Sequence, residues 1–313
     1  MPAGMVGDIV DKISQNWRVA NDIEITLEAN PSSVEAAKFA DFRAAGVNRV
    51  SLGVQALNDD ALKRLGRLHD VSQALAALEI AANTFDRFSF DLIYARQHQA
   101  LAEWQGELAQ ALSFGAKHVS MYQLTIEPET AFGQRARLGK LPGLPDQDVA
   151  ADMYEHTQAA CAAAGLPAYE ISNHAAVGDE SRHNMIYWSG GDFLGIGPGA
   201  HGRVTVGPVR YATETWLAPN KWLAAAMAGN GETSRAALTP VEQADEYMMM
   251  GLRKTSGIDM ARWVALGDGT PVMVDPDLIE NGVVRVADNR LIATDRGRAI
   301  LNHVIQALLL GET

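Results

Sequence analysis

Residues 49–94 read RVSLGVQALNDDALKRLGRLHDVSQALAALEIAANTFDRFSFDLIY, and this stretch decides the fold class. Arg49–Val54 and Phe88–Tyr94 are predicted strands. Asp59–Leu65 and Val71–Asn83, between them, have the apolar spacing of helices. Strands that alternate with helices over short loops are typical of parallel βα units. The stretch therefore predicts an α/β fold.

The same alternation continues on both sides of this stretch. Further strands are predicted at Asp22–Glu28, His118–Leu124 and Ala168–Ser172, and further helices from Ser32 or Ser33 to Ala45, at Leu101–Phe114 and at Asp146–Ala164. Polar residues end successive strands: Glu28, Gln55, Asp91 and Gln123. In a (β/α) barrel that end carries the chemistry, and in an open doubly wound sheet it carries the ligand crevice. The pattern alone is compatible with either architecture.

The character of the sequence changes after Ser189. Six glycines crowd into residues 190–202. Helices are then predicted around Glu242–Lys254 and at Met260–Ala265, two short strands at Gly282–Ala287 and Arg290–Ala293, and a final helix at Asp295–Leu310. Helices with a two-stranded wing predict a small winged-helix-like α+β domain. The expected domains are residues 1–175, a glycine-rich connecting region at 176–235, and a C-terminal domain at 236–313.

Composition restricts the classes of partner. The 313 residues carry a formal net charge of −12, which opposes phosphate backbones, so nucleic acid is not an expected partner. No apolar run approaches the roughly 20 residues of a membrane span, and the first residues lack the pattern of a signal peptide. A cytoplasmic location is expected. The single cysteine, Cys161, can form no internal disulfide and cannot hold an iron–sulfur cluster alone.

The most specific local pattern is Ser181-Arg182-His183-Asn184-Met185-Ile186-Tyr187-Trp188. His183 offers an imidazole nitrogen to haem iron, and Tyr187 and Trp188 offer flat apolar faces to a porphyrin ring. Arg182 could pair with a propionate. Residue types alone favour a different interpretation, a core histidine with aromatic packing.

Several stretches resemble the HemN/HemW group of radical-SAM proteins, in order along nearly the whole chain. They are Ile25–Pro31, Asn48–Gln55 with Leu65–His69, Ser89–Tyr94, Ser120–Pro128, Tyr169–Asn173, the His183-Asn184-x-x-Tyr187-Trp188 motif and Gly190–His201. The C-terminal region resembles the small terminal domain of this group. The resemblance implies a radical-SAM (β/α) barrel followed by that domain.

The resemblance also implies roles for individual residues. Glu28, Gln55, Arg67 and Asp91 match positions that contact S-adenosylmethionine (SAM). Carboxylates can accept hydrogen bonds from ribose hydroxyls or an amino group, and a guanidinium can pair with the methionine carboxylate. The motif of His183, Asn184, Tyr187 and Trp188 is the one associated with haem in the haem-chaperone subgroup, with His183 as the expected contact of the haem iron.

The sequence departs from the group in two places. The group has a Cys-x-x-x-Cys-x-x-Cys loop after its first barrel strand and then a Gly-Gly-Gly-Thr-Pro strand, and both precede the point that matches Met1. We therefore expect an N-terminally truncated, partial barrel without the first two strands and without the [4Fe-4S] ligands, so that SAM is not reductively cleaved. Ala95–Gln99 replaces a turn that usually reads like Leu-Pro-Gly-Gln.

Three hypotheses follow. The first is a haem chaperone that binds haem and passes it to acceptor proteins. The second is an enzyme of porphyrin biosynthesis, an oxygen-independent coproporphyrinogen III oxidase. The third is an inactive fragment. The haem motif favours the first, and the absence of the cluster cysteines leaves enzymatic activity an open question. Haem and its acceptor proteins are the expected partners, without a membrane span, although peripheral association with a membrane is compatible with the sequence.

Overall fold

The computed structural model describes residues 1–128, 130–269 and 274–309. The chain divides into two compact units, Met1–Glu180 and Ser181–Thr313. The domain limits predicted from the sequence, at residues 175 and 235, stay predictions.

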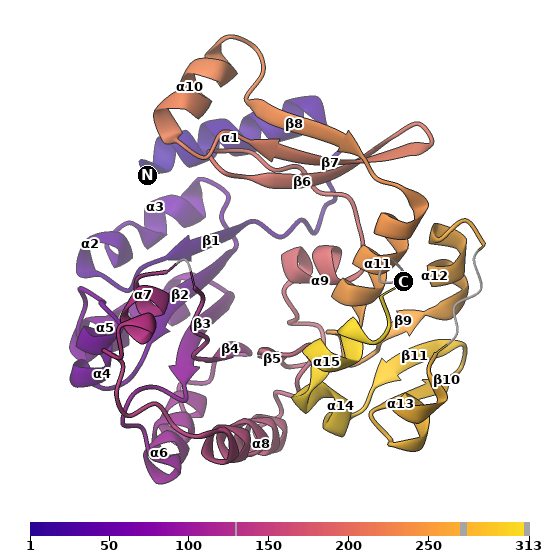
Figure 1. Ribbon diagram of the computed structural model, residues 1–313. Helices are drawn as coiled ribbons and strands as arrows, with labels where there is room; N and C mark the ends of the chain where they lie inside the picture. The colour runs from indigo at the N-terminus through magenta and orange to yellow at the C-terminus, as the bar shows by residue number, and fades with distance from the viewer. Residues whose placement is uncertain (129, 270–273, 310–313) are drawn as a thin grey trace. The chain divides into compact units, whose positions relative to one another are not determined.

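The first unit is an α/β unit (Figure 1). Its strands are β1 (Thr26–Ala29), β2 (Arg49–Gln55), β3 (Arg87–Tyr94), β4 (His118–Gln123) and β5 (Asn173–Ala175). Its helices are α1 (Ala3–Asn16), α2 (Ser33–Ala36), α3 (Phe39–Ala44), α4 (Asp59–Arg64), α5 (Val71–Thr84), α6 (Leu101–Leu112), α7 (Ala131–Arg137) and α8 (Gln147–Ala163). The strands form one sheet in the order β1-β2-β3-β4-β5. Strands β1 to β4 are parallel, as the βα alternation predicts.

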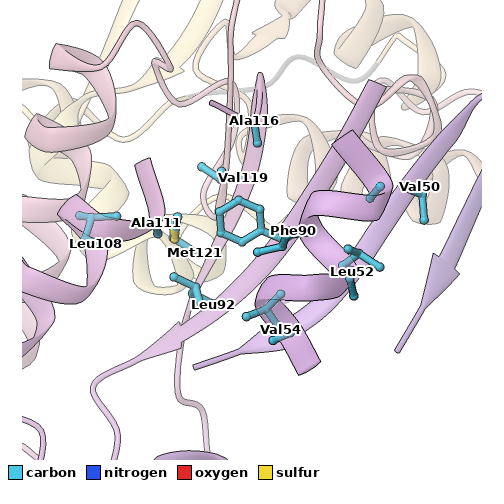
Figure 2. Packing of buried hydrophobic residues seen from close by; sticks show 14 of the residues in the cluster. Val50, Leu52, Val54, Phe90, Leu92, Leu108, Ala111, Ala116, Val119 and Met121 are labelled. Carbon is cyan, nitrogen blue, oxygen red and sulfur yellow. The ribbon is translucent and has the colours of Figure 1, made fainter. Parts of the chain in front are cut away.

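The two faces of this sheet differ in polarity because side chains alternate along each strand. Val50, Leu52 and Val54 of β2 are fully buried, as are Phe90 and Leu92 of β3. Figure 2 shows them in one cluster with residues of β4 and α6. Burying a side chain of this size stabilises the fold by about 2 kcal/mol, so this layer is the main core of the unit. The alternate positions are mostly polar and form the other face.

One predicted strand of this unit is misplaced. The sequence suggested a strand at Ala168–Ser172, but only Ala168 forms an isolated bridge, and the strand itself is β5, which runs antiparallel to β4. The chain turns between these residues, because the buried Glu170 carboxylate accepts the Ser172 N–H at 3.2 Å and the Tyr169 N–H donates to the Asn173 carbonyl at 3.1 Å. A buried side chain that binds its own backbone produces a turn that β-propensity cannot predict.

The second unit contains two three-stranded sheets (Figure 1). Its strands are β6 (His201–Val206), β7 (Val209–Thr215), β8 (Glu232–Ala237), β9 (Ile258–Asp259), β10 (Val284–Ala287) and β11 (Arg290–Ala293). Its helices are α9 (Arg182–Trp188), α10 (Pro219–Met227), α11 (Pro240–Gly251), α12 (Met260–Leu266), α13 (Pro276–Glu280), α14 (Asp295–Ala299) and α15 (Leu301–Gln306). Strands β6-β7-β8 form one antiparallel sheet, and β10-β11-β9 form the other.

The predicted wing is the β10–β11 hairpin. Asp288 and Asn289 connect the strands with positive φ angles of 50° and 59°, which suit the two-residue turn of a right-twisted hairpin. A third strand, β9, extends this sheet. The predicted final helix is instead two helices, α14 and α15, and its last predicted residue, Leu310, lies outside the described residues.

Candidate functional site

The polar face of the first sheet brings together residues from neighbouring strands. Glu28 on β1 is in register with Ser51 on β2, and Ser51 is in register with Ser89 on β3. One step further along, Asp91 on β3 is in register with Ser120 on β4. Residues in register on one face of a sheet lie side by side, so the strands carry a continuous polar surface.

A cavity of about 280 Å³ opens on this surface. It is lined by Glu28, Ala29, Asn30, Ser51, Gly53 and Asp91. The register between β2 and β3 shifts between Leu52 and Gln55, which is a bulge of the kind that often borders a binding site. Gly53 lies in this bulge and also lines the cavity. Two of the four predicted SAM contacts, Glu28 and Asp91, therefore face the same space.

The Asp91 carboxyl is electrostatically unusual. Burial raises its pKa to about 6, and the nearby Glu28 carboxylate raises it as well. A hydrogen bond with Ser120 and the charges of Arg49 and Arg67 act in the opposite direction but are outweighed. The negative charge of an ionised Asp91 is thus not fully balanced by the surrounding protein groups. A cationic ligand in the cavity would stabilise the ionised form.

Gln55 and Arg67 meet each other at the end of β2. Arg67 Nη2 donates to Gln55 Oε1 at 3.1 Å, and Gln55 is buried with a φ of +71°. Neither residue is among those that line the cavity of Glu28 and Asp91. The structure therefore pairs these two predicted SAM contacts with each other, and only the charge of Arg67 reaches Asp91.

Sequence motifs did not single out the other polar residues of this sheet, which are joined by hydrogen bonds. Arg49 is buried and its Nη2 donates to Ser89 Oγ at 2.9 Å, and Ser89 Oγ donates to Ser51 Oγ at the same distance. Ser120 Oγ donates to Asn173 Oδ1 at 2.6 Å. The signal that could have found them is the alternation within the strands, where each second residue of Arg49–Gly53 and Ser89–Asp91 is polar or small.

The haem-type motif lies on α9 in the second unit. Ser181 caps this helix by accepting the Asn184 N–H at 3.4 Å. His183 is exposed and packs edge-on against Tyr187 at 4.5 Å between ring centroids, and Tyr187 packs in the same way against Phe193 at 4.4 Å. Positions four apart share a helix face, so the helix places His183 beside Tyr187.

The other two motif residues are also four apart. Asn184 and Trp188 are half-buried, and the Arg253 guanidinium lies 5.8 Å from the centroid of the Trp188 ring. Because His183 is exposed, the interpretation of a core histidine does not describe this residue. An accessible imidazole beside an aromatic ring can ligate a haem iron.

Cys161 does not provide a metal ligand. It is buried in α8, and burial raises the pKa of its thiol to about 12, so the thiolate form that binds metals is disfavoured. Among the described residues, no group of three or more His, Cys, Asp or Glu side chains could hold a metal ion. The residues present therefore do not fit a [4Fe-4S] cluster, which needs several thiolates.

Within residues 1–128, 130–269 and 274–309, no helix is both long enough and apolar enough to cross a bilayer.

Two family models match the chain. The model described as "Radical SAM superfamily" matches residues 5–104, and the model described as "HemN C-terminal domain" matches residues 238–300. The heme chaperone HemW of Escherichia coli is 35% identical over 96% of this chain and 79% of its own length. The chain belongs to the HemW family of radical SAM proteins.

Other relatives of this HemW family member have similar coverage. The heme chaperone HemW of Bacillus subtilis is 35% identical over 96% of the chain and 80% of its own length. The mitochondrial radical S-adenosyl methionine domain-containing protein 1 of Bos taurus is 36% identical over 97% of the chain and 72% of its own length. The solved structure of the coproporphyrinogen III oxidase HemN of Escherichia coli matches with a TM-score of 0.78 and 19% identity, over 99% of this chain and 75% of that one. The α/β fold with a C-terminal domain, predicted from the sequence, is thereby confirmed.

Proposed function

We propose that this chain binds haem on α9 and delivers it to acceptor proteins. The observation that carries the proposal is the exposed His183 imidazole, packed edge-on against Tyr187 on a capped helix. Its relatives in Escherichia coli and Bacillus subtilis bear the name heme chaperone. His183 would contact the haem iron, and Tyr187 and Trp188 would lie against the porphyrin ring, with Asn184 on the same helix.

A second ligand, SAM, is proposed for the cavity in the first unit. Glu28 and Asp91 would accept hydrogen bonds from its amino group or ribose hydroxyls, and a positively charged ligand would compensate the two carboxylates. Gln55 and Arg67 would border the site from the end of β2. SAM can supply radical chemistry only with a reduced cluster, and the residues of this chain do not fit one, so no reaction step is assigned to it.

Haem titration followed by visible absorbance tests the haem proposal. The wild-type chain should give a saturable Soret shift, and His183→Ala should weaken binding by roughly tenfold or more and move the Soret maximum, because the iron loses a nitrogen ligand. His303→Ala is the matched control, since His303 is an exposed histidine on α15 of the same unit. Equal effects of the two substitutions would exclude His183 as the iron contact, and no saturable shift in the folded wild type would exclude haem binding.

Delivery needs its own measurement. A chain loaded with haem should lose it to apomyoglobin, a haem-free acceptor, with a matching transfer of the Soret band. Retention of the haem under these conditions would describe a storage or cofactor site instead of a chaperone.

A further inference from the structure

The turn that ends α9 is bound by two arginines from different parts of the second unit. Arg210 on β7 donates from Nη1 to the Gly190 carbonyl at 2.8 Å and from Nη2 to the Gly191 carbonyl at 3.0 Å. Arg262 on α12 donates from Nη1 to the Ser189 carbonyl at 3.0 Å and from Nη2 to the Gly190 carbonyl at 3.2 Å. Three successive carbonyls thus accept four hydrogen bonds from two guanidinium groups.

These bonds hold the turn that follows α9, because the helix itself ends at Trp188. The last carbonyls of a helix have no partner within it, and here they accept N–H groups of this same turn: Ser189, Gly190 and Gly191 donate to Met185, Tyr187 and Ile186. A planar guanidinium presents two parallel N–H donors, so one arginine can hold two neighbouring carbonyls at once. The arginines therefore anchor the turn whose N–H groups bind the last carbonyls of α9.

Arg262 is itself held in place. Its guanidinium lies 4.6 Å from the centroid of the Tyr247 ring, and the Tyr247 hydroxyl accepts the Asp259 N–H at 3.1 Å. Cation–π contact with an anchored ring restricts the rotamers of the arginine. Tyr247, Asp259 and Arg262 all lie in residues 238–300, the part that matches the HemN C-terminal domain.

A third cation also binds this turn, and like Arg262 it lies in the C-terminal domain. Lys254 Nζ donates to Ser189 Oγ at 3.3 Å, and burial lowers the pKa of this ammonium group. Gly251 on α11 lies close enough that an added Cβ would approach the Trp188 carbonyl to 3.5 Å. The C-terminal domain therefore packs against the same end of α9 that carries Tyr187 and Trp188.

We propose that Arg210 and Arg262 are positioning residues for the haem motif, and that the C-terminal domain serves to hold α9 in the orientation that presents His183. The two arginines bind the turn from two different elements, Arg210 from β7 and Arg262 from α12. This proposal rests on the proposed haem-binding function, and its first test is independent of haem.

Hydrogen exchange of the full chain without haem provides that test. The N–H groups of Gly190 and Gly191 donate to the carbonyls of Tyr187 and Ile186, so they report on the end of α9. Arg262→Ala and Arg210→Ala should each accelerate their exchange by roughly tenfold, because the turn opens locally more often. Arg262→Lys should restore part of the protection, since an ammonium group can bind one carbonyl but not two in parallel.

Arg290→Ala is the matched control. Arg290 also binds two carbonyls of a turn in the same domain, those of Ser256 at 2.6 Å and Gly257 at 2.8 Å, but not those of residues 189–191. Its loss should leave the exchange of Gly190 and Gly191 unchanged. Unaltered exchange in Arg262→Ala, or equal acceleration in Arg290→Ala, would overturn the positioning role.

Haem titration of the same variants completes the test. Arg262→Ala should raise the dissociation constant for haem by roughly tenfold and broaden the Soret band, with Arg262→Lys between it and the wild type. A dissociation constant equal to that of Arg290→Ala would mean that the arginines hold the turn without serving the haem site. Absence of haem binding in the wild type would instead overturn the proposed function together with the haem part of this inference, while exchange would still decide whether the arginines hold α9.

Discussion

Asp91 shows how a single carboxyl can report on ligand binding. Its pKa of about 6 means that it ionises just below neutral pH, in a cavity that Glu28 also lines. A bound cation would favour the ionised form. Conversely, protonation of Asp91 would remove a partner for the amino group of SAM.

We therefore expect the affinity for SAM to fall as the pH drops through about 6, and Asp91→Asn to bind weakly at every pH. The carboxyl is the group that changes charge in this range, so the amide variant should lose the pH dependence as well as most of the affinity. Isothermal titration calorimetry between pH 5 and 8 would measure both. A wild-type affinity that is flat over this range would exclude Asp91 as a contact.

The same substitution should affect stability in the opposite direction. A carboxyl whose folded pKa lies above its unfolded value near 3.8 favours the folded state at low pH, and this contribution is lost as the pH rises towards 6. At pH 7 the ionised Asp91 thus costs about 3 kcal/mol, which Asp91→Asn should recover in chemical denaturation. At pH 4 the two chains should be nearly equal in stability.

The sequence predicted which secondary-structure elements carry the residues of the candidate site better than it predicted which of these residues contact one another. Glu28 and Asp91 were predicted at the ends of neighbouring strands, and the structure places both on strands of one sheet. Asp91 lies in the middle of β3, however, and not at its end. The bond between Arg67 and Gln55 depends on the left-handed backbone of Gln55 and on the bulge before it, and neither is encoded in residue periodicity. The roles proposed for all these residues stay untested predictions.

At the scale of elements, the loop after β3 carries unusual backbone geometry. Ala95 and His98 have positive φ angles of 55° and 62°, a region where a side chain is strained. They lie in Ala95–Gln99, the segment that the sequence predicts to depart from the related group. Arg96, Gln97 and Gln99 between and beside them are buried, and the Glu107 carboxylate on α6 binds both Arg96 and Gln99. The polar network around Glu107 thus holds a backbone that a glycine would adopt without strain.

Ala95→Gly should consequently stabilise the chain by about 1 kcal/mol, which corresponds to a rise of about 2–4 °C in Tm. Ala116→Gly is the matched control, because Ala116 is equally buried, 6% exposed, and has no positive φ. The control should lose stability through a more flexible unfolded chain and a lost methyl contact. If calorimetry found that both substitutions change Tm in the same direction, this would argue against strain at Ala95.

Element prediction failed mainly in the second unit. The sheet of β6, β7 and β8 was not foreseen, because most of β8 is exposed, β7 is mostly half-buried without alternation, and β6 follows a glycine-rich stretch. Exposed strands lack the strict apolar alternation that marks a half-buried one. Strands β2 and β3 of the first unit were foreseen because alternate residues of each are buried in a single core.

At the scale of the whole molecule, the chain has two compact units, and the larger cluster of buried apolar residues lies entirely in the first. Units with separate cores can unfold in separate steps. We expect the amide protons of the two units to exchange with different free energies of opening.

Leu108→Ala and Leu252→Ala form a matched pair for this expectation. Both leucines are fully buried, Leu108 in the first unit and Leu252 in the second. Each substitution should cost about 3 kcal/mol and reduce protection only within its own unit. Loss of protection throughout the chain in either variant would show that the two units unfold as one.

Cys161 has a practical consequence at this scale. It is the only thiol in the chain and is fully buried within α8. The folded protein should therefore not react with maleimides or methanethiosulfonates, whereas the unfolded chain should react with one equivalent of the reagent. Each exposed position changed to cysteine would become a unique attachment point for a spin label or fluorophore. A pair of such labels, one in each unit, would give the distance between them in solution without first removing a natural cysteine.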